Sequence, residues 1–141
     1  MHMYTHTPAL RNNGDGTFTE GTRDAGLGLE ENGMGLAVAD VDNDGLLDVF
    51  VTSIFAASWK QRRETQSPFG HRGNFLYRNL GGRKFSVVDT VRPGEEVNRV
   101  GSLSDAGWAW GAAWLDSNND GILELVTANG YSIPETTFDD G

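Results

Sequence analysis

The sequence predicts an all-β protein of antiparallel strands, equivalent to about two four-stranded sheets. The 141 residues include 19 glycines but only four prolines, which favours many tight turns over long helices. Hydrophobic residues make up 38% of the chain and aromatic residues 10%, as in a globular protein. This length allows one domain with a sizeable core.

Two motifs occur twice, in the same order. Residues 11–18 (RNNGDGTF) and 78–85 (RNLGGRKF) share Arg, Asn, Gly and Phe at the same spacing. Residues 33–49 align without gaps on residues 109–125. The chain therefore repeats a unit of about seventy residues with loops of variable length.

The aligned segments alternate with a period of two, as strands do. In the first copy Met34, Leu36 and Val38 share one face, and glycine and alanine share the other. A large face opposite a small face suits a strand packed between two neighbouring sheets. In the second copy the large positions are Trp108, Trp110 and Trp114.

Hairpins are expected at the other motif. A Gly-Gly pair separates the β-rich residues 74–79 from residues 84–90, and residues 9–22 give a similar hairpin. The glycine-rich turn of the latter holds Asp15, which could be read as part of a metal loop. Asp15 stands alone without ligand spacing, which favours a simple turn. In total we expect about eight strands and no helix.

Two long connections remain between these elements. Residues 54–73 gather basic side chains in an otherwise acidic chain, as in a solvated loop or, less commonly, a loop that binds a partner. Residues 91–106 are rich in glycine and charge, and we expect them to cross between the repeats.

Three aspartates occupy alternate positions of the first acidic loop (residues 40–48), and a glycine follows them. Alternate residues of a tightly curled loop point inward, and glycine permits the sharp bend. An anionic, flexible cage of oxygen atoms suits calcium, whereas carboxylates this dense would raise one another's pKa without an ion. The expected ligands are Asp40, Asp42, Asp44, the carbonyl of Leu46, and Asp48.

A second calcium ion is expected in the second acidic loop (residues 116–124). This loop has one charge fewer and ends in Glu instead of Asp, so we expect it to bind calcium more weakly. The expected ligands are Asp116, Asn118, Asp120, the carbonyl of Ile122, and Glu124.

Neither loop has the spacing of an EF-hand. An EF-hand loop ends in a bidentate Glu at position 12, but position 12 is Val51 in one loop and Thr127 in the other. Both residues lie in β-rich runs, where an EF-hand would have a helix. Two readings remain: calcium held in a β-hairpin loop, and an acidic turn without metal.

The net charge of −9 argues against nucleic acid or an anionic membrane surface as the main partner. Seven of the 20 acidic residues lie in the two acidic loops, so the acidity is largely a property of these sites. The absence of cysteine excludes disulfides, thiolate metal sites and cysteine nucleophiles. We expect no membrane span and no signal peptide within the chain.

Three segments carry a resemblance to a known family: MGLAVADVDNDGLLDVFVTS, NFLYRNLGGRKF and WGAAWLDSNNDGILELVTANGY. They resemble FG-GAP/VCBS-type repeats, the blades of integrin-α-like β-propellers. The sequence of these segments is most similar to that of ASPIC/UnbV-associated, cartilage-acidic-protein-like proteins. The resemblance implies a calcium-stabilised propeller that acts in adhesion or binding and is secreted, periplasmic or surface-exposed.

The resemblance also implies a division of the chain into blades. Residues 1–32 would be the last two strands of one blade and residues 33–90 a complete blade. Residues 91–106 would be a crossing linker, and residues 107–141 the first two strands of the next blade. A closed propeller needs about four to eight blades. The chain would thus be a partial propeller: a fragment, a unit that assembles with its own copies, or a small open domain.

The function expected from these features is a non-catalytic calcium-binding module that presents loops to a protein or glycan. Exposed blade faces with tryptophan would also allow self-association, and a pure assembly unit is a further hypothesis. A metal-assisted extracellular hydrolase is the enzymatic alternative. Against this alternative, His2 and His6 lie at the start of the chain, which we expect to be mobile, and His71 lies in a polar loop. No serine has a nucleophile-elbow context.

Overall fold

The computed structural model describes residues 8–28, 33–53, 73–89, 103, 106–107 and 109–130. This part of the chain is β-rich with antiparallel strand pairs, which confirms the all-β, antiparallel part of the predicted fold class. The strands are β1 (Leu10–Asn12), β2 (Phe18–Glu20), β3 (Gly33–Ala39), β4 (Asp48–Ser53), β5 (Phe75–Asn79), β6 (Phe85–Asp89), β7 (Ala109–Leu115) and β8 (Glu124–Asn129).

The expectation of no helix is wrong for one short element, α1 (Thr22–Ala25). Thr22 is buried, and its hydroxyl accepts a hydrogen bond from the backbone N–H of Ala9 at 2.8 Å. Gly26 ends the helix in the left-handed conformation (φ 80°). A single helical turn is too short to show a 3.6-residue periodicity, so the sequence pattern gave no signal for it.

Several predictions from the sequence concern residues that the structure does not describe. These are the three histidines, Trp108, and nearly all of the two long connections, residues 54–73 and 91–106. In the part of the chain that the structure does describe, no helix is long and apolar enough to cross a membrane.

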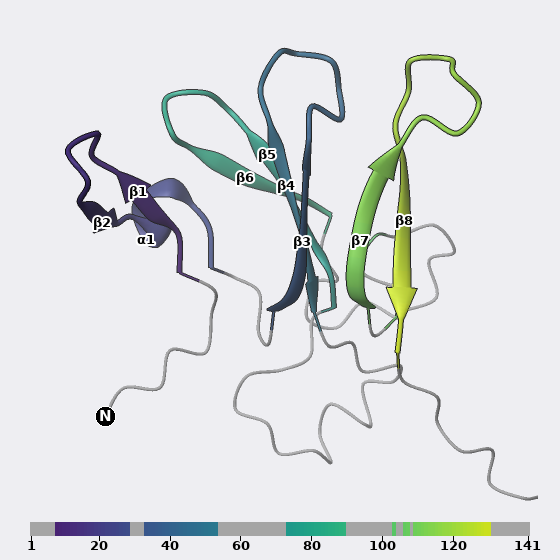
Figure 1. Ribbon diagram of the computed structural model, residues 1–141, viewed down its shortest axis with the longest axis horizontal. Coiled ribbons are helices and arrows are strands. Elements are labelled where there is room, and N and C mark those ends of the chain that lie inside the picture. Colours follow the sequence, from purple (N-terminus) through teal and green to yellow (C-terminus); the bar gives the residue numbers. More distant parts are fainter. Residues whose placement is uncertain are drawn as a thin grey trace, which may run out of the picture.

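The strands form three sheets that stand side by side (Figure 1). The central sheet has four strands in the order β3-β4-β5-β6, as in a simple meander. The pair β1-β2, with α1, lies on one side of it, and the pair β7-β8 lies on the other, next to β3. The two acidic loops project from the same end of their sheets (Figure 1).

The repeat seen in the sequence is also present in the backbone. The β3-β4 pair changes register between Gly33 and Gly35, and the β7-β8 pair does so between Ala109 and Gly111. These positions are equivalent in the alignment of the two copies. The β-bulge at each of them is therefore part of the repeated unit.

The β1-β2 hairpin corresponds in the same way to the β5-β6 hairpin. Leu10 pairs with Glu20 in the first, and the equivalent Tyr77 pairs with Val87 in the second. In each turn, the asparagine that ends the first strand accepts a hydrogen bond from the glycine two residues later, at 2.8 and 3.0 Å. The predicted turn around Asp15 is confirmed.

One face of the central sheet packs against β7-β8. Ala37, Phe50 and Leu76 are buried on this face. Trp114 and its neighbours Ala112 and Leu125 cover them, and the rings of Trp114 and Phe50 meet edge-on with centroids 6.1 Å apart.

The opposite face packs against the segment that follows α1. Val51, Phe75 and Tyr77 are buried there, and Leu27 contacts them. The rings of Phe75 and Tyr77 stack with centroids 5.9 Å apart. Together the two clusters place the core on both sides of the central strands β4 and β5.

The expectation that both faces of β3 are packed holds for the small face alone. On that face Ala37 is buried against β7-β8, whereas Met34, Leu36 and Val38 on the large face are 40%, 55% and 46% exposed. In the part of the chain that the structure describes, these apolar side chains therefore form an exposed face.

The tryptophans of β7 do not share one exposed face as expected. The bulge at Trp110 interrupts the alternation, so Trp110 is 55% exposed while Trp114 packs into the core. A bulge inserts one extra residue and changes which side chains face which side.

Asn74 joins the central sheet to the segment before β7. Its side chain is fully buried, and its carbonyl oxygen accepts a hydrogen bond from the N–H of Ser53 at 2.9 Å. Its amide nitrogen donates to the carbonyls of Leu103 (3.2 Å) and Gly107 (3.4 Å). One side chain thus satisfies three backbone groups, one at the end of β4 and two in the segment before β7.

The backbones of β3 and β7 approach closely at Gly35. A Cβ added to Gly35 would lie 2.5 Å from the carbonyl oxygen of Trp110 and 3.3 Å from the Cα of Gly111. Only a residue without a side chain allows this contact between the two sheets.

Gly35→Ala should lower the free energy of unfolding by about 1–3 kcal/mol, because the methyl group would push the two sheets apart. Urea unfolding followed by tryptophan fluorescence measures the change. Gly21→Ala is the control, since a Cβ at Gly21 meets no atom within 4 Å and its backbone is not left-handed. Equal stability of the two variants would contradict the close packing of β3 on β7.

Candidate metal centre

The first acidic loop joins β3 to β4 as a hairpin loop. It begins directly after Ala39 and ends at Asp48, the first residue of β4. Two residues have a left-handed backbone, Asn43 (φ 58°) and Gly45 (φ 87°). Asparagine and glycine are the residues that best tolerate this conformation, so the sequence favours the tight curl.

Carboxylates of the loop hold its own backbone. Asp40 accepts hydrogen bonds from the N–H groups of Asp44 (3.0 Å) and Gly45 (2.8 Å), one on each oxygen. Asp44 Oδ1 accepts one from the N–H of Leu46 at 2.9 Å. These bonds turn the chain back on itself and bring its two ends together.

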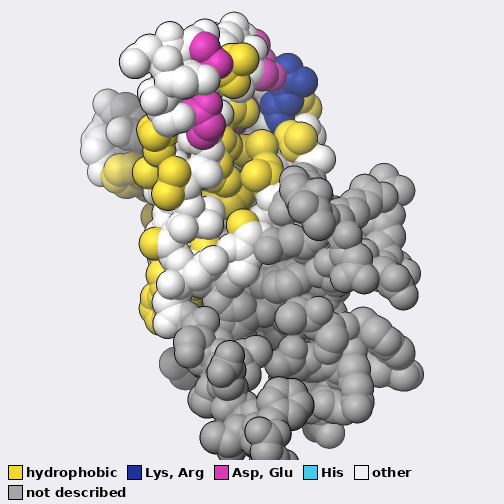
Figure 2. Space-filling model, turned by 90° about the vertical axis from the view of Figure 1, so that its right-hand side faces the viewer, with side chains coloured by type: hydrophobic (Ala, Val, Ile, Leu, Met, Phe, Trp, Pro, Cys, Tyr) yellow, Lys and Arg dark blue, Asp and Glu magenta, His cyan; other side chains and the backbone are white. Residues whose placement is uncertain are grey.

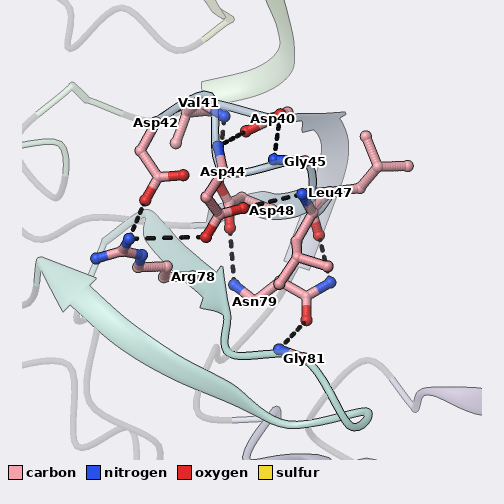
Figure 3. Close-up of polar contacts among 11 residues, drawn as sticks. Asp40, Val41, Asp42, Asp44, Gly45, Leu47, Asp48, Arg78, Asn79 and Gly81 are labelled. Atoms are coloured by element: carbon pink, nitrogen blue, oxygen red, sulfur yellow. Dashed lines mark hydrogen bonds and ion pairs between the residues drawn. The ribbon is translucent and has the colours of Figure 1, made fainter.

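Asp48 lies at the base of the loop with no exposure to solvent. Its two carboxylate oxygens accept hydrogen bonds from the N–H of Val41 (3.2 Å) and from the N–H of Asn79 (2.7 Å) (Figure 3). The side chain of Asn79 donates in turn to the carbonyl of Leu47 at 2.9 Å. The loop is therefore fastened to the end of β5.

Three of the expected ligands converge. One carboxylate oxygen from each of Asp40, Asp42 and Asp48 lies within 4.8 Å of the other two. Charges this close repel one another unless a cation lies between them. The donors are all hard oxygen atoms, which suit Ca²⁺ better than Zn²⁺ or copper.

Asp44 is placed differently from Asp40, Asp42 and Asp48. One oxygen of Asp44 faces Arg78, 3.7 Å from Nη2, and the other holds the N–H of Leu46. Arg78 also forms an ion pair with Asp42 (Figure 3). The guanidinium thus supplies part of the positive charge that the loop requires.

The second acidic loop repeats the backbone of the first. Asp116 accepts hydrogen bonds from the N–H groups of Asp120 (3.0 Å) and Gly121 (2.8 Å), as Asp40 does from its equivalents. Asn119 has a left-handed backbone (φ 60°), as Asn43 has. The N–H of Ile122 donates to Asp120 at 2.8 Å, which matches the bond between Leu46 and Asp44.

The side chains of the second loop make different contacts from those of the first loop. Glu124 accepts hydrogen bonds from both the N–H and the hydroxyl of Ser117, each at 2.8 Å. Asn118 donates to Asp120 at 2.9 Å. Among the described residues, a convergent group of three carboxylates occurs at Asp40, Asp42 and Asp48, and none occurs in this loop.

Hydrogen bonds lower the pKa of two aspartates below the usual 3.8. For Asp120 the main cause is the N–H of Ile122, followed by the side chain of Asn118. For Asp15 the cause is the hydroxyl and then the N–H of Thr17. The turn around Asp15 therefore stabilises its own carboxylate without a cation.

The two acidic loops touch each other. The side-chain amide of Asn43 donates to the carbonyl of Gly121 at 3.4 Å. This contact lies at the end of the molecule from which both loops project (Figure 1). A change that orders one loop can therefore affect the conformation of the other loop.

Sequence reasoning did not assign a role to Arg78 and Asn79, although both contact the first loop. A signal was present, because the pair recurs as Arg11 and Asn12 in the other copy of its motif. The role of Arg78 and Asn79 depends on the position of β5 beside β4, which brings both residues to the first loop.

Arg78→Met should lower the melting temperature in EGTA, because the like charges of Asp42 and Asp44 lose their counter-charge. It should also enlarge the rise caused by calcium, because an ion in the loop no longer competes with the guanidinium. Thermal unfolding with and without calcium measures both effects. The nearby exposed Arg83→Met is the matched control. A smaller rise in the Arg78 variant than in the parent would contradict this account.

Comparison with known proteins adds independent information. Residues 6–51, which hold β1 to β3, the first acidic loop and the start of β4, match the model of the FG-GAP-like repeat. The curated proteins and the solved structures gave no match to the chain. The chain carries an FG-GAP-like repeat, and its first acidic loop lies within that repeat.

Proposed function

We propose that the chain is a non-catalytic calcium-binding module of FG-GAP-like repeats, in which calcium is structural. The observation that carries the proposal is the convergence of Asp40, Asp42 and Asp48 within 4.8 Å. Support also comes from the second acidic loop, which has the same backbone hydrogen bonds and the same left-handed residues. Two loops with a common backbone favour a common ligand.

In the first loop Asp40, Asp42 and Asp48 would hold the ion. Asp44 would join them once calcium displaces Arg78, and the carbonyl of Leu46 would complete the shell. In the second loop the corresponding ligands would be Asp116, Asn118, Asp120, Ile122 and Glu124. Calcium would neutralise the carboxylates and fix the two strands that each loop joins.

The three sheets would be blades of a β-propeller, with residues 33–90 as the complete one. The β7-β8 sheet packs face to face on the central sheet, as neighbouring blades do, and the segment after α1 covers the other face. Residues 6–51 match an FG-GAP-like repeat, and such repeats are commonly extracellular. The module would act at the cell surface, in the periplasm or outside the cell, and bind a protein or glycan. Its carboxylates would serve as calcium ligands, so the proposal assigns no catalytic residue.

A structural ion stabilises the folded state through mass action. At a calcium concentration a hundredfold above the dissociation constant, each site would contribute about 2.7 kcal/mol. For a chain of this size such a contribution is a large fraction of the total stability.

Calcium should raise the melting temperature of the chain, and magnesium at the same concentration should not, because Mg²⁺ favours small octahedral sites with several waters. Circular dichroism in EGTA, magnesium and millimolar calcium measures this. The combined variant Asp40→Ala and Asp116→Ala should lose the response.

Asp15→Ala is the matched control, because Asp15 lies in an acidic glycine turn whose carboxylate is satisfied by Thr17. This variant should keep the full calcium response. A parent protein that is folded yet unaffected by calcium would refute the proposed function.

A further inference from the structure

Among the described residues, two strands have an open edge where their equivalents in the repeat are paired. β4 pairs with β3 on one side and β5 on the other, whereas the equivalent β8 pairs with β7 within the described chain. Likewise β5 pairs with β4 and β6, whereas the equivalent β1 pairs with β2. The open edges of β8 and β1 therefore correspond to the two strand edges that pair with each other between β4 and β5.

Two faces are open in the same way. The small face of β3 is covered by β7, but Ala113, Leu115 and Val126, on the equivalent face of β7-β8, are exposed. Figure 2 views this side of the molecule and shows hydrophobic side chains gathered below the acidic loop. The large face of β3 is exposed on the opposite side of the molecule.

Equivalent glycines show what fits on the open face. A Cβ on Gly35 would meet the carbonyl of Trp110, whereas a Cβ on the equivalent Gly111 would meet no atom within 4 Å. The residue equivalent to Trp110 is Met34, which lies at the matching bulge on the large, exposed face of β3. Gly111 of one copy therefore has room for the Met34 backbone of another.

We propose that copies of the chain associate head to tail. The β7-β8 pair of one copy and the β1-β2 pair of the next form a composite four-stranded sheet in the order β7-β8-β1-β2. This sheet packs its Ala113 and Val126 face on the Met34, Leu36 and Val38 face of the second copy. The packing of β7-β8 on the central sheet within one copy is the template for this contact.

The repeat also gives the register of the new strand pair. Within the central sheet Val49 pairs with Tyr77 and Phe50 with Leu76. The equivalent pairs in the composite sheet are Leu125 with Leu10 and Val126 with Ala9. Ala9 makes hydrogen bonds toward the β2 side of its strand. Alternation therefore directs Leu10 to the open edge and makes Ala9–Val126 a non-hydrogen-bonded pair.

The second copy would complete the second acidic loop. Arg78 and Asn79 contact the first loop from β5, and their equivalents on β1 are Arg11 and Asn12. In the composite sheet the N–H of Asn12 reaches Glu124, and Arg11 reaches Asp120. This part of the inference rests on the proposed function, since Asn12 of the second copy would fix Glu124, a ligand of the second calcium site.

A head-to-tail contact produces a ring when its rotation closes and a filament when it does not. Each copy supplies about two blades, so a closed propeller of four to eight blades would contain about two to four copies.

A disulfide between copies tests the register. The chain has no cysteine, so Ala9→Cys with Val126→Cys introduces a single pair. Cα atoms in a non-hydrogen-bonded pair lie about 4.5 Å apart, within disulfide range. β1 and β8 lie on opposite sides of the central sheet in one copy (Figure 1). Ala9 directly precedes β1 and Val126 lies in β8, so a bond between them must join different copies. Oxidation in calcium should give covalent oligomers on a denaturing gel.

Leu10→Cys with Val126→Cys is the matched control, because a shift of one residue places the two thiols on opposite faces. It should give no covalent oligomer. Light scattering of the parent chain should give a mass of two to four times 15.3 kDa, and Gly111→Val should give 15.3 kDa with an unchanged circular dichroism spectrum.

A parent mass of 15.3 kDa at every concentration would overturn the inference. So would an oligomer that cross-links with both cysteine pairs or with neither. A monomer whose melting temperature still rises with calcium would overturn the assembly and leave the proposed function intact.

Discussion

The side chain of Asp48 has no exposure to solvent, although it carries a carboxylate. Burial of a carboxylate costs free energy unless its oxygens are hydrogen-bonded and its charge is balanced. Asp48 receives one N–H from Val41, at the start of the loop, and one from Asn79, at the end of β5. The same group therefore closes the loop, joins it to the next hairpin and faces two further carboxylates. The shape of the first acidic loop and the position of β5 both depend on it.

Balance of charge explains the arrangement around this group. Arg78 approaches Asp42 and Asp44 from outside the loop, and an ion between Asp40, Asp42 and Asp48 would act from inside. An exposed ion pair contributes little to stability, because water screens it. A divalent cation with direct oxygen contacts is the stronger counter-charge. On this account the arginine balances the loop charge when no ion is bound, and calcium replaces it as the counter-charge of Asp44.

Much of this fold could be predicted from the sequence, because the patterns that define it each span only a few neighbouring residues. Glycine turns, alternating strands and the spacing of the aspartates can each be read from a few neighbouring residues. Three features could not be read in this way. The helix α1 is one turn long, the bulge at Trp110 reverses which residues face the core, and Arg78 meets Asp42 only when β5 lies beside β4. The helix is too short to show a periodic pattern, the bulge is one inserted residue in an otherwise regular alternation, and the ion pair joins segments that are distant in the chain.

Calcium stoichiometry tests the central claim most directly. Native mass spectrometry or equilibrium dialysis on the parent chain counts bound ions without reliance on stability. The account predicts two calcium ions per chain, with the tighter one lost in Asp40→Ala. A folded chain that binds no calcium at millimolar concentration would contradict it.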